Sequence, residues 1–325
     1  MRQATSKWGV DVLHQGRHEL WRGVSADHKQ IIRSFMIHFH TAVLTAASEQ
    51  PGPNGEAVKA FCFHRGSVGN FFFSGCRKFF NSLSAAITLW SSLVGIPHET
   101  AVLPIINSNH TVTIGAQLED GSKIFGQNQI SHPGDVVDKQ HQGQQPLPAR
   151  IRRLFYLNDW RQEIEFHADP SVLSTLSHAA MVVYSMGSLY TSICASLATK
   201  GVGDHIATLA CPKVLILNGT VDRETHGMTA MDFVWAIVHA CVGSSRHNAN
   251  QRTAKQDDAA LVSQFVTHVL YLTTSEVPMD GGRLEELGLR VIPISEHAAS
   301  NPQHYRTRAL VSAILDILPP DRGSS

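Results

Sequence analysis

Apolar side chains in the first part of the chain recur at the spacing of one helix face. Between residues 27 and 47, four of them stand four positions apart: Ile31, Phe35, Phe39 and Val43. Side chains at this spacing line one stripe of an α-helix. The pattern predicts a helix over residues 27–47 and, beyond a Pro- and Gly-containing loop, a second helix from about Gly69 to Val94. We expect its two phenylalanine clusters, residues 71–73 and 79–80, to lie in the core.

The middle of the chain shows the shorter alternation that is typical of β-strands. Strands are expected at residues 102–106, 111–118 and 122–127. The last two are joined by Glu119-Asp120-Gly121, and an Asp-Gly pair favours the left-handed backbone positions of a tight hairpin turn. The pattern therefore predicts a β-hairpin excursion in this part of the protein.

Beyond residue 150, apolar runs of strand length alternate with helical patterns. Strands are expected at residues 153–156, 181–185, 213–218, 268–273 and 290–294. Helices are expected at residues 170–178, 190–200, 229–242, 258–266, 282–287 and 305–317. This alternation is typical of an α/β fold with a mostly parallel sheet that helices cover on both faces. We expect one domain over residues 1–325, with polar insertions near 132–149 and 243–257.

Composition narrows the classes of function. The 325 residues carry 27 basic and 27 acidic side chains, so the formal charge is zero. Bulk attraction to nucleic acid or to an anionic membrane is therefore not expected. No apolar stretch approaches the roughly 20 residues of a spanning helix, and the polar start lacks the apolar core of a secretion signal.

Cysteine usage points to the compartment. The chain has five cysteines and no CxxC pair, which favours free thiols in a reducing environment over disulfides or a zinc site. We therefore expect a cytoplasmic protein. Its partner is expected to be a small molecule rather than nucleic acid or membrane, and assembly into a homo-oligomer is left open.

Three of the expected strands are followed by polar segments. These are residues 107–110, 185–188 and 218–225. Ligands of parallel α/β sheets bind outside the carboxyl ends of the strands, so the three segments predict one crevice. Asn107 is expected to reach this crevice, whereas Asn109 is expected to satisfy its own turn.

The turn that follows the expected strand at 181–185 is the strongest single indication of function. It contains Gly187 and Ser188 and leads into a helical stretch that begins with three hydroxyl-bearing residues: Tyr190, Thr191 and Ser192. Backbone N–H groups at the start of such a helix favour an anion, most often a phosphate. An ordinary turn capped by Ser and Thr has the same pattern, and the turn alone does not separate the two interpretations.

Three further residues carry a functional and a structural interpretation. Asp222 precedes Arg223 and Glu224 just beyond an expected strand; we favour a metal or ligand-hydroxyl role for Asp222 over a solvated cluster of ion pairs. Arg223 has the weaker case as a phosphate ligand. Asn70 is either a ligand contact or the N-cap of its helix.

Taken together, the motifs resemble the 2-phospho-L-lactate transferase / gluconeogenesis factor family, in its eukaryotic and uncharacterised branch. The resemblance covers the chain from about residue 15 to its end. It rests on residues 65–75 (RGSVGNFFFSG), 102–107, 111–113, 118–121, 184–193 (YSMGSLYTSI) and 217–230 (LNGTVDRETHGMTA), which occur in family order.

The resemblance implies a Rossmann-like α/β fold that binds a nucleotide diphosphate-type ligand. One branch of the family transfers a phospholactyl-type group from a guanylylated donor to a deazaflavin alcohol and releases GMP, with a divalent metal. Another branch binds UDP-sugars and regulates carbon metabolism or cell-wall precursor supply without evident catalysis. The crevice implied here consists of Asn70, Gly187, Ser188, Tyr190, Thr191, Ser192, Asn218 and Asp222. Asn107 is added from its strand end, and Thr225 because it flanks Asp222 in the family pattern.

The chain departs from the family at its beginning. Family members open with a strand, a GGGTG-type turn and an Asp-rich segment that helps to hold metal and phosphate. The first 60 residues here contain only isolated glycines and no Asp-Asp run. We therefore expect a domain that is incomplete at its N-terminus, through a truncated gene model or the loss of the first βα unit, and an exposed strand edge.

Three functions follow from these expectations. The first, which we favour, is phospholactyl-type transfer from a GDP- or GTP-type donor to an alcohol, with Mg²⁺. The second is a non-catalytic regulator that binds a UDP-sugar, and the third is a truncated, inactive remnant. No nucleophile or general base can be assigned from the residues, and Asp222 is the one candidate metal ligand.

Overall fold

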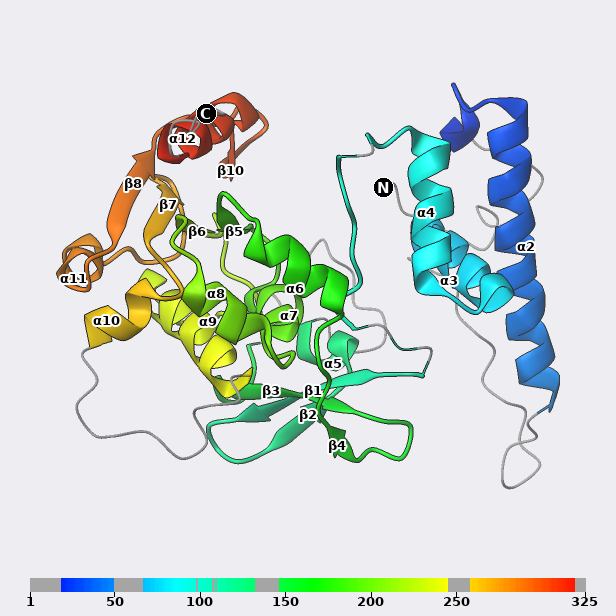
Figure 1. Cartoon of the computed structure of the whole chain (residues 1–325), viewed down its shortest axis with the longest axis horizontal. Coiled ribbons are helices and arrows are strands. Elements are labelled where there is room, and N and C mark those ends of the chain that lie inside the picture. Colours follow the sequence, from blue (N-terminus) through cyan, green and yellow to red (C-terminus); the bar gives the residue numbers. More distant parts are fainter. Residues whose placement is uncertain are drawn as a thin grey trace. The chain divides into compact units, whose positions relative to one another are not determined.

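The computed structural model describes residues 19–49, 67–97, 99–106, 108, 110–131, 146–244 and 258–318. The chain divides into two compact units, Met1–Pro104 and Ile105–Ser325, each with its own core. Asn107, Asn109 and most of the two expected insertions lie outside the described residues. Figure 1 shows the elements of both units.

Unit 1 is helical. Its described elements are η1 (Glu19–Trp21), α2 (Ala26–Glu49), α3 (Val68–Phe80) and α4 (Leu83–Val94). Helix α2 confirms the first helix prediction. The expectation of one helix to Val94 is wrong at its centre, because Asn81 adopts a left-handed backbone (φ 50°) and Ser82 starts a new helix. The Ser82 hydroxyl oxygen accepts a hydrogen bond from the Ala85 amide at 3.1 Å, which caps α4.

The phenylalanines of α3 divide between the core and the surface. Phe72 is fully buried and packs edge-on against Phe35, with ring centroids 5.7 Å apart. Phe79 is 63% exposed and Phe80 is 41% exposed, so the expectation that residues 79–80 lie in the core is wrong. They occupy the last turn of α3, where each packs against the ring of Phe35.

Unit 2 contains two four-stranded sheets. The parallel sheet has the order β5-β6-β7-β8, with β5 (Val182–Tyr184), β6 (Lys213–Ile216), β7 (His268–Leu272) and β8 (Arg290–Ile294). The antiparallel sheet has the order β2-β1-β3-β4, with β1 (Thr113–Leu118), β2 (Lys123–Phe125), β3 (Ile151–Leu157) and β4 (Glu163–Ile164). The strand predictions in these regions are confirmed.

One expected strand is absent. Residues 102–106 form no strand among the described residues. Val102 is 54% exposed, and Pro104 has no amide to donate to a ladder. The hairpin expected at Asp120-Gly121 is present, but only Gly121 has a positive φ, of 86°. The Asp120 carboxylate instead accepts bonds from the amide and hydroxyl of Ser122, at 2.9 and 2.6 Å.

Helices cover both faces of the parallel sheet. The helical elements of unit 2 are α5 (Gln127–Ser131), α6 (Pro170–Ser177), the π-helical η2 (Leu189–Cys194), α7 (Ala195–Leu197), α8 (Val202–Thr208), α9 (Ala230–Ser244), α10 (Asp258–Ser263), α11 (Gly281–Glu286) and α12 (Thr307–Ile317). Alternation along the strands separates the two faces. Val214 of β6 packs with α12, and the next residue, Leu215, belongs to the larger cluster with α9.

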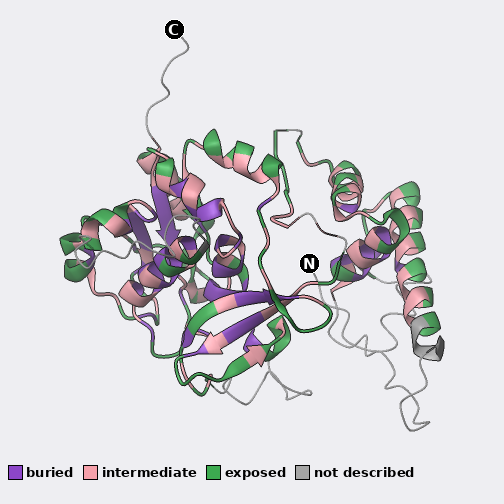
Figure 2. Cartoon of the chain, turned by 60° about the horizontal axis from the view of Figure 1, so that its bottom comes forward, coloured by how far each residue is buried: buried purple, intermediate pink, exposed green. Residues whose placement is uncertain are grey.

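The larger core also joins the two sheets. Side chains of β1 and β3 share a cluster with η2 and α9, and Figure 2 shows buried residues concentrated in the strands of both sheets. A short hairpin, β9 (His297–Ala298) with β10 (Asn301–Tyr305), precedes α12 and was not predicted. The four described cysteines are free. Among the described helices, none has the length and apolar character needed to cross a bilayer.

Candidate ligand site at the strand ends

The turn after β5 leads directly into η2, as predicted, and its amides have an internal partner. The amides of Tyr190 and Thr191 both donate to Oε2 of Glu224 at 3.1 Å. The Thr191 hydroxyl donates to Oε1 of the same carboxylate at 2.6 Å. These amides belong to the first turn of η2, where backbone donors have no intrahelical acceptor. The carboxylate of Glu224 therefore takes the position that an external anion would occupy.

The Glu224 carboxyl group is deeply buried, with 4% of the residue exposed. Burial raises its pKa, against the hydrogen bonds from Thr191 and Tyr190, which lower it. Asp222 nearby adds a smaller contribution in the same direction as burial. Glu224 therefore caps η2 through three donors, and these bonds offset the unfavourable desolvation of its carboxyl group. Nothing in the sequence distinguishes Glu224 from a solvated loop residue.

Asp222 organises the same loop from within. Its Oδ1 accepts bonds from the amides of Glu224 and Thr225 at 3.0 Å, and from the Thr225 hydroxyl at 2.7 Å. Thr225 is fully buried. The two residues hold the loop in the shape that delivers Glu224 to η2, which gives them a positioning role.

Asn218 ties the ends of β5 and β6 together. The side-chain amide of Asn218 donates to the Gly187 carbonyl at 3.0 Å, and the main-chain carbonyl of Asn218 accepts from the Ser275 hydroxyl at 2.8 Å. The predicted convergence of strand ends is therefore present for the loops after β5 and β6, and the loop after β7, which was not among the predicted segments, joins them. The third predicted segment, residues 107–110, follows no strand in the described part of the chain, and its Asn107 and Asn109 lie outside the described residues.

A cavity of about 480 Å³ lies beside Asn218 at the carboxyl ends of β5 and β6. The residues that line it are Met186, Asn218, Gly219, Thr220, Gln303, His304, Tyr305, Thr307 and Leu310. Its wall thus combines the strand-end loops with β10 and the start of α12. The position agrees with the general rule for ligands of parallel sheets, although a third of the lining residues (Gln303, His304 and Tyr305) come from a hairpin that the sequence did not reveal.

The β9–β10 hairpin closes the cavity through close backbone packing. A Cβ atom at Gly219 would lie 1.9 Å from the Gln303 carbonyl oxygen, so only glycine fits there. The Tyr305 hydroxyl donates to the Leu217 carbonyl at 2.6 Å, and Thr274 donates to the carbonyl of Pro302. Burial raises the pKa of Tyr305 beyond its ordinary range, and its hydroxyl therefore serves as a neutral anchor.

Helix α12 begins at this cavity. Thr307 is its first residue and lines the wall. Arg306, at the N-cap, makes no side-chain capping bond and instead pairs with Glu296 at 2.6 Å. The first-turn amides of an 11-residue helix and the positive end of its dipole thus lie at the cavity.

The structure brings some of the predicted residues to one place and not others. Gly187, Ser188, Tyr190, Thr191, Ser192, Asn218, Asp222 and Thr225 lie on the loops after β5 and β6 or on η2, and of these only Asn218 lines the strand-end cavity. Asn70 is an exposed residue inside α3 of unit 1, whose N-cap is Ser67 rather than Asn70. The ligand roles of these residues stay predictions.

The possible metal ligands of the described residues are dispersed or already bonded. No group of three or more His, Cys, Asp or Glu side chains suited to a metal ion occurs in the described ranges. At Asp222, Oδ1 already accepts three bonds. The described residues therefore do not assemble a metal site of their own.

The architecture defines a class: a Rossmann-like α/β protein with a cavity at its strand ends. Solved structures agree. Protein BH3568 from Bacillus halodurans superposes with a TM-score of 0.58 at 21% identity, over 78% of this chain and 73% of that chain. A second structure of the same protein, described as a member of the UPF0052 family, gives 0.58 at 22% identity. At these identities the likeness shows the fold.

The family model for 2-phospho-L-lactate transferase CofD matches residues 31–295. The chain therefore belongs to the CofD family, as the motifs indicated. An uncharacterized protein of Saccharomyces cerevisiae, YNL011C, is 28% identical over 88% of this chain and 75% of its own length. The gluconeogenesis factor of Bacillus subtilis is 26% identical over 53% of this chain.

The bacterial relatives are matched over part of their length. The alignments span 47% of the Bacillus subtilis protein and 48% of the gluconeogenesis factor of Halalkalibacterium halodurans. The chain thus spans about half the length of these curated relatives, and what the whole proteins do bears on this chain only as a proposal.

Proposed function

We propose that the protein binds a nucleotide diphosphate-type ligand in the strand-end cavity and transfers a phospholactyl-type group from a guanylylated donor to an alcohol. The observation that carries this proposal is the cavity itself, whose wall joins two strand ends to the N-terminus of α12. Family membership supports the reaction type. The transfer is proposed to take place in the cytoplasm.

The cavity has the features that suit a phosphate-bearing ligand. Its volume of about 480 Å³ falls within the roughly 300–1,000 Å³ that is common for small-molecule sites. Helix N-termini stabilise phosphate groups through free amides and the helix dipole. Thr220 and Thr307 add hydroxyl donors, and His304 adds an imidazole that can donate or accept a hydrogen bond.

In the proposed reaction, the acceptor hydroxyl oxygen attacks the phosphorus of the phospholactyl group. A new P–O bond forms, the bond between that phosphorus and the bridging oxygen breaks, and GMP leaves with the electron pair while the hydroxyl proton passes to solvent. The chain's contribution is to hold the donor phosphates by helix amides and hydroxyl groups, which stabilise developing negative charge.

The second candidate is a non-catalytic regulator that binds a UDP-sugar. It is favoured by the names of the bacterial relatives, which are gluconeogenesis factors. The same cavity and the same α12 N-terminus would hold the diphosphate of such a ligand.

Calorimetry with GDP, GTP and UDP-N-acetylglucosamine, with and without Mg²⁺, tests the proposal together with an assay for GMP release from a guanylylated phospholactate donor. Guanine-nucleotide binding with GMP release in the presence of an alcohol acceptor is the expected result. Binding of the UDP-sugar alone, without GMP release, would establish the regulator instead. No binding of any of the three nucleotides would overturn both candidates and leave the inactive remnant.

A further inference from the structure

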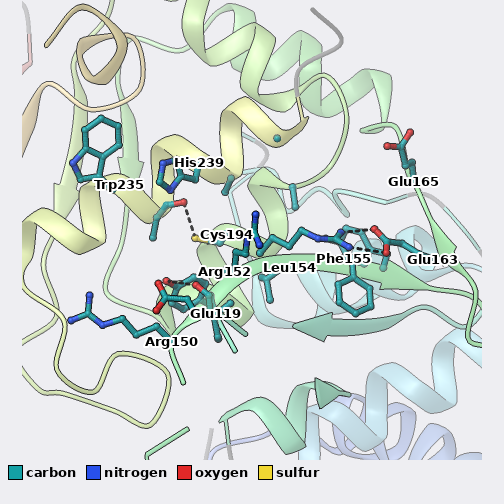
Figure 3. Close-up of a pocket in the computed structure, with 18 of the residues that line it drawn as sticks. Glu119, Arg150, Arg152, Leu154, Phe155, Glu163, Glu165, Cys194, Trp235 and His239 are labelled. Carbon is teal, nitrogen blue, oxygen red and sulfur yellow. Dashed lines mark hydrogen bonds and ion pairs between the residues drawn. The ribbon is translucent and has the colours of Figure 1, made fainter. Parts of the chain in front are cut away.

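A second cavity, of about 380 Å³, lies in unit 2 between β3, η2 and α9. Figure 3 shows Arg152 projecting from β3, with Trp235 and His239 of α9 across from it. None of its lining residues belongs to the strand-end cavity. The site is therefore independent of the proposed nucleotide site.

The interior of this cavity is apolar, and its polar atoms are already bonded. Tyr190, Cys194 and Met228 line it and are buried. The Tyr190 hydroxyl donates to the Ile151 carbonyl at 3.3 Å, and the Cys194 thiol donates to the Ala236 carbonyl at 3.6 Å. Burial raises the pKa of both the Tyr190 and Cys194 side chains, so both stay neutral. The interior thus suits an uncharged, apolar or aromatic group.

The charged residues at the rim are mostly paired with one another. Arg150 pairs with Asp232 at 3.3 Å. Arg153 and Glu163 form a two-pronged pair, and Lys200 pairs with Glu165 at 3.1 Å. These three pairs neutralise six of the eight Arg, Lys, Asp and Glu side chains in the lining.

Two rim residues of opposite charge are left over. Within the described part of the chain, neither Arg152 nor Glu119 has a hydrogen bond or ion pair through its side chain. Glu119 directly follows β1, and Arg152 lies on the neighbouring strand β3. The Glu119 amide donates to the Arg150 carbonyl at 2.9 Å, which holds the two segments together. Glu119 is close enough to the cavity to raise the pKa of Tyr190.

Arg152 owes its position to a β-bulge. Gln117 pairs with Arg153 and Leu118 pairs with Ile151, so Arg152 is the extra residue of β3. Bulges redirect side chains and are frequent beside binding sites. The bulge aims the guanidinium group of Arg152 across the cavity toward α9 (Figure 3).

We propose that this cavity binds an α-amino acid with an aromatic side chain. The ligand carboxylate pairs with Arg152, its ammonium group pairs with Glu119, and its ring enters the apolar interior beside Trp235. One free cation, one free carboxylate and an uncharged interior match a zwitterion with a hydrophobic side chain, and each charged contact satisfies a group that the chain itself leaves open.

L-phenylalanine and its two truncated analogues test the proposal. 3-Phenylpropionate lacks the ammonium group, and 2-phenylethylamine lacks the carboxylate. Binding is measured by calorimetry and by ¹⁹F NMR of 5-fluorotryptophan-labelled protein, with the Trp235 signal assigned through Trp235→Phe. We expect L-phenylalanine to shift the Trp235 signal and to bind at least tenfold more tightly than either analogue.

Charge-removing variants separate the two contacts. Arg152→Gln is expected to weaken L-phenylalanine and 3-phenylpropionate at least tenfold while leaving 2-phenylethylamine unchanged, and Glu119→Gln is expected to do the converse. The matched controls are Arg308→Gln and Glu286→Gln, exposed residues of α12 and α11 outside this cavity; these should bind as wild type. No shift of Trp235 with L-phenylalanine, or equal affinity in wild type and both cavity variants, would overturn the proposal.

Discussion

Helices η2 and α12 both begin beside the carboxyl ends of the parallel strands, and they use their N-termini differently. At η2, the amides of Tyr190 and Thr191 are capped by the buried carboxylate of Glu224. At α12, the first residue lines a cavity of about 480 Å³, and the N-cap side chain makes no capping bond. The comparison shows that a favourable helix terminus becomes a candidate binding site only where the fold supplies no anion of its own.

The cost of the internal cap explains the difference. Burying a carboxyl group is unfavourable, and the raised pKa of Glu224 records that penalty. The three donors of η2 offset it. This exchange stabilises the start of η2 after the β5 turn. The η2 terminus thus acts as a structural support, and the α12 terminus is the one that faces open space.

Removing the internal cap should give the largest effect. Glu224→Ala leaves two buried amides and one hydroxyl without an acceptor, and we expect a loss of about 3–5 kcal/mol in the free energy of unfolding. Urea denaturation followed by circular dichroism measures it. The control is Glu286→Ala on the exposed face of α11, for which a change below about 0.5 kcal/mol is expected. Equal losses in both variants would show that Glu224 does not hold η2.

The wall of the open cavity should be next in sensitivity. Gly219→Ala places a Cβ against the Gln303 carbonyl, and backbone crowding of this kind costs about 1–3 kcal/mol. Gly282→Ala, with nothing within 4 Å of the added atom, is the matched control and should be neutral or slightly stabilising. Thermal unfolding compares the two. If Gly219→Ala were as stable as the control, the β9–β10 hairpin would not pack on the strand end as described.

Hydroxyl groups that line the strand-end cavity should contribute to nucleotide affinity, whereas a hydroxyl group of η2 outside it should not. Thr220→Ala combined with Thr307→Ala is expected to weaken GDP about tenfold, the loss of about 1.4 kcal/mol that one or two hydrogen bonds supply. Ser192→Ala, an exposed hydroxyl of η2 outside the cavity, should leave the affinity unchanged. Calorimetry gives both dissociation constants. A loss of affinity in Ser192→Ala alone, with the double variant unchanged, would place the bound phosphate at η2 instead.

The smallest expected effect is a pH dependence of the free energy of unfolding that comes from Glu224. Because the folded-state pKa of Glu224 is raised, the folded protein retains a proton that the unfolded chain loses near the ordinary value of about 4.3. The stability that this group contributes is therefore present below that pH and is lost as the pH rises through the raised pKa. As the pH rises from 4 to 7, the wild type should lose stability relative to Glu224→Gln, whose side chain does not titrate. The difference between their free energies of unfolding should therefore move in favour of the variant. A difference that grows in favour of wild type would contradict the burial of Glu224.

The parallel sheet could be predicted because its strands are short apolar runs separated by helical patterns. Residues 213–218 and 268–273 carry this signal within themselves, and β6 and β7 formed there. The β9–β10 hairpin could not be predicted in this way, because its residues are polar and its place depends on a bond from Tyr305 to the Leu217 carbonyl 88 residues away. The break at Asn81 was missed because an apolar helical pattern continues across it.

The meeting of two strand ends was predictable, whereas the contacts within it were not. The polar strand ends drew attention to Gly187 and Asn218, which the structure joins by a hydrogen bond; their ligand roles stay predictions. Glu224 and His304 were missed as contributors, since neither burial nor the approach of β10 can be read from the local pattern. A charged residue within a polar loop looks the same in sequence whether it is solvated or buried as a cap.

The most direct test follows backbone amides during titration of ²H,¹⁵N-labelled protein with GDP, and in parallel with UDP-N-acetylglucosamine. We expect the amide signals of Gly219, Thr220 and Thr307 to shift in a saturable manner. Those of Tyr190 and Thr191 should stay in place, because both amides remain bonded to Glu224. Saturable shifts at Tyr190 and Thr191 with none at Thr307 would overturn the assignment of the ligand to the α12 terminus, because the ligand would then have displaced the internal carboxylate.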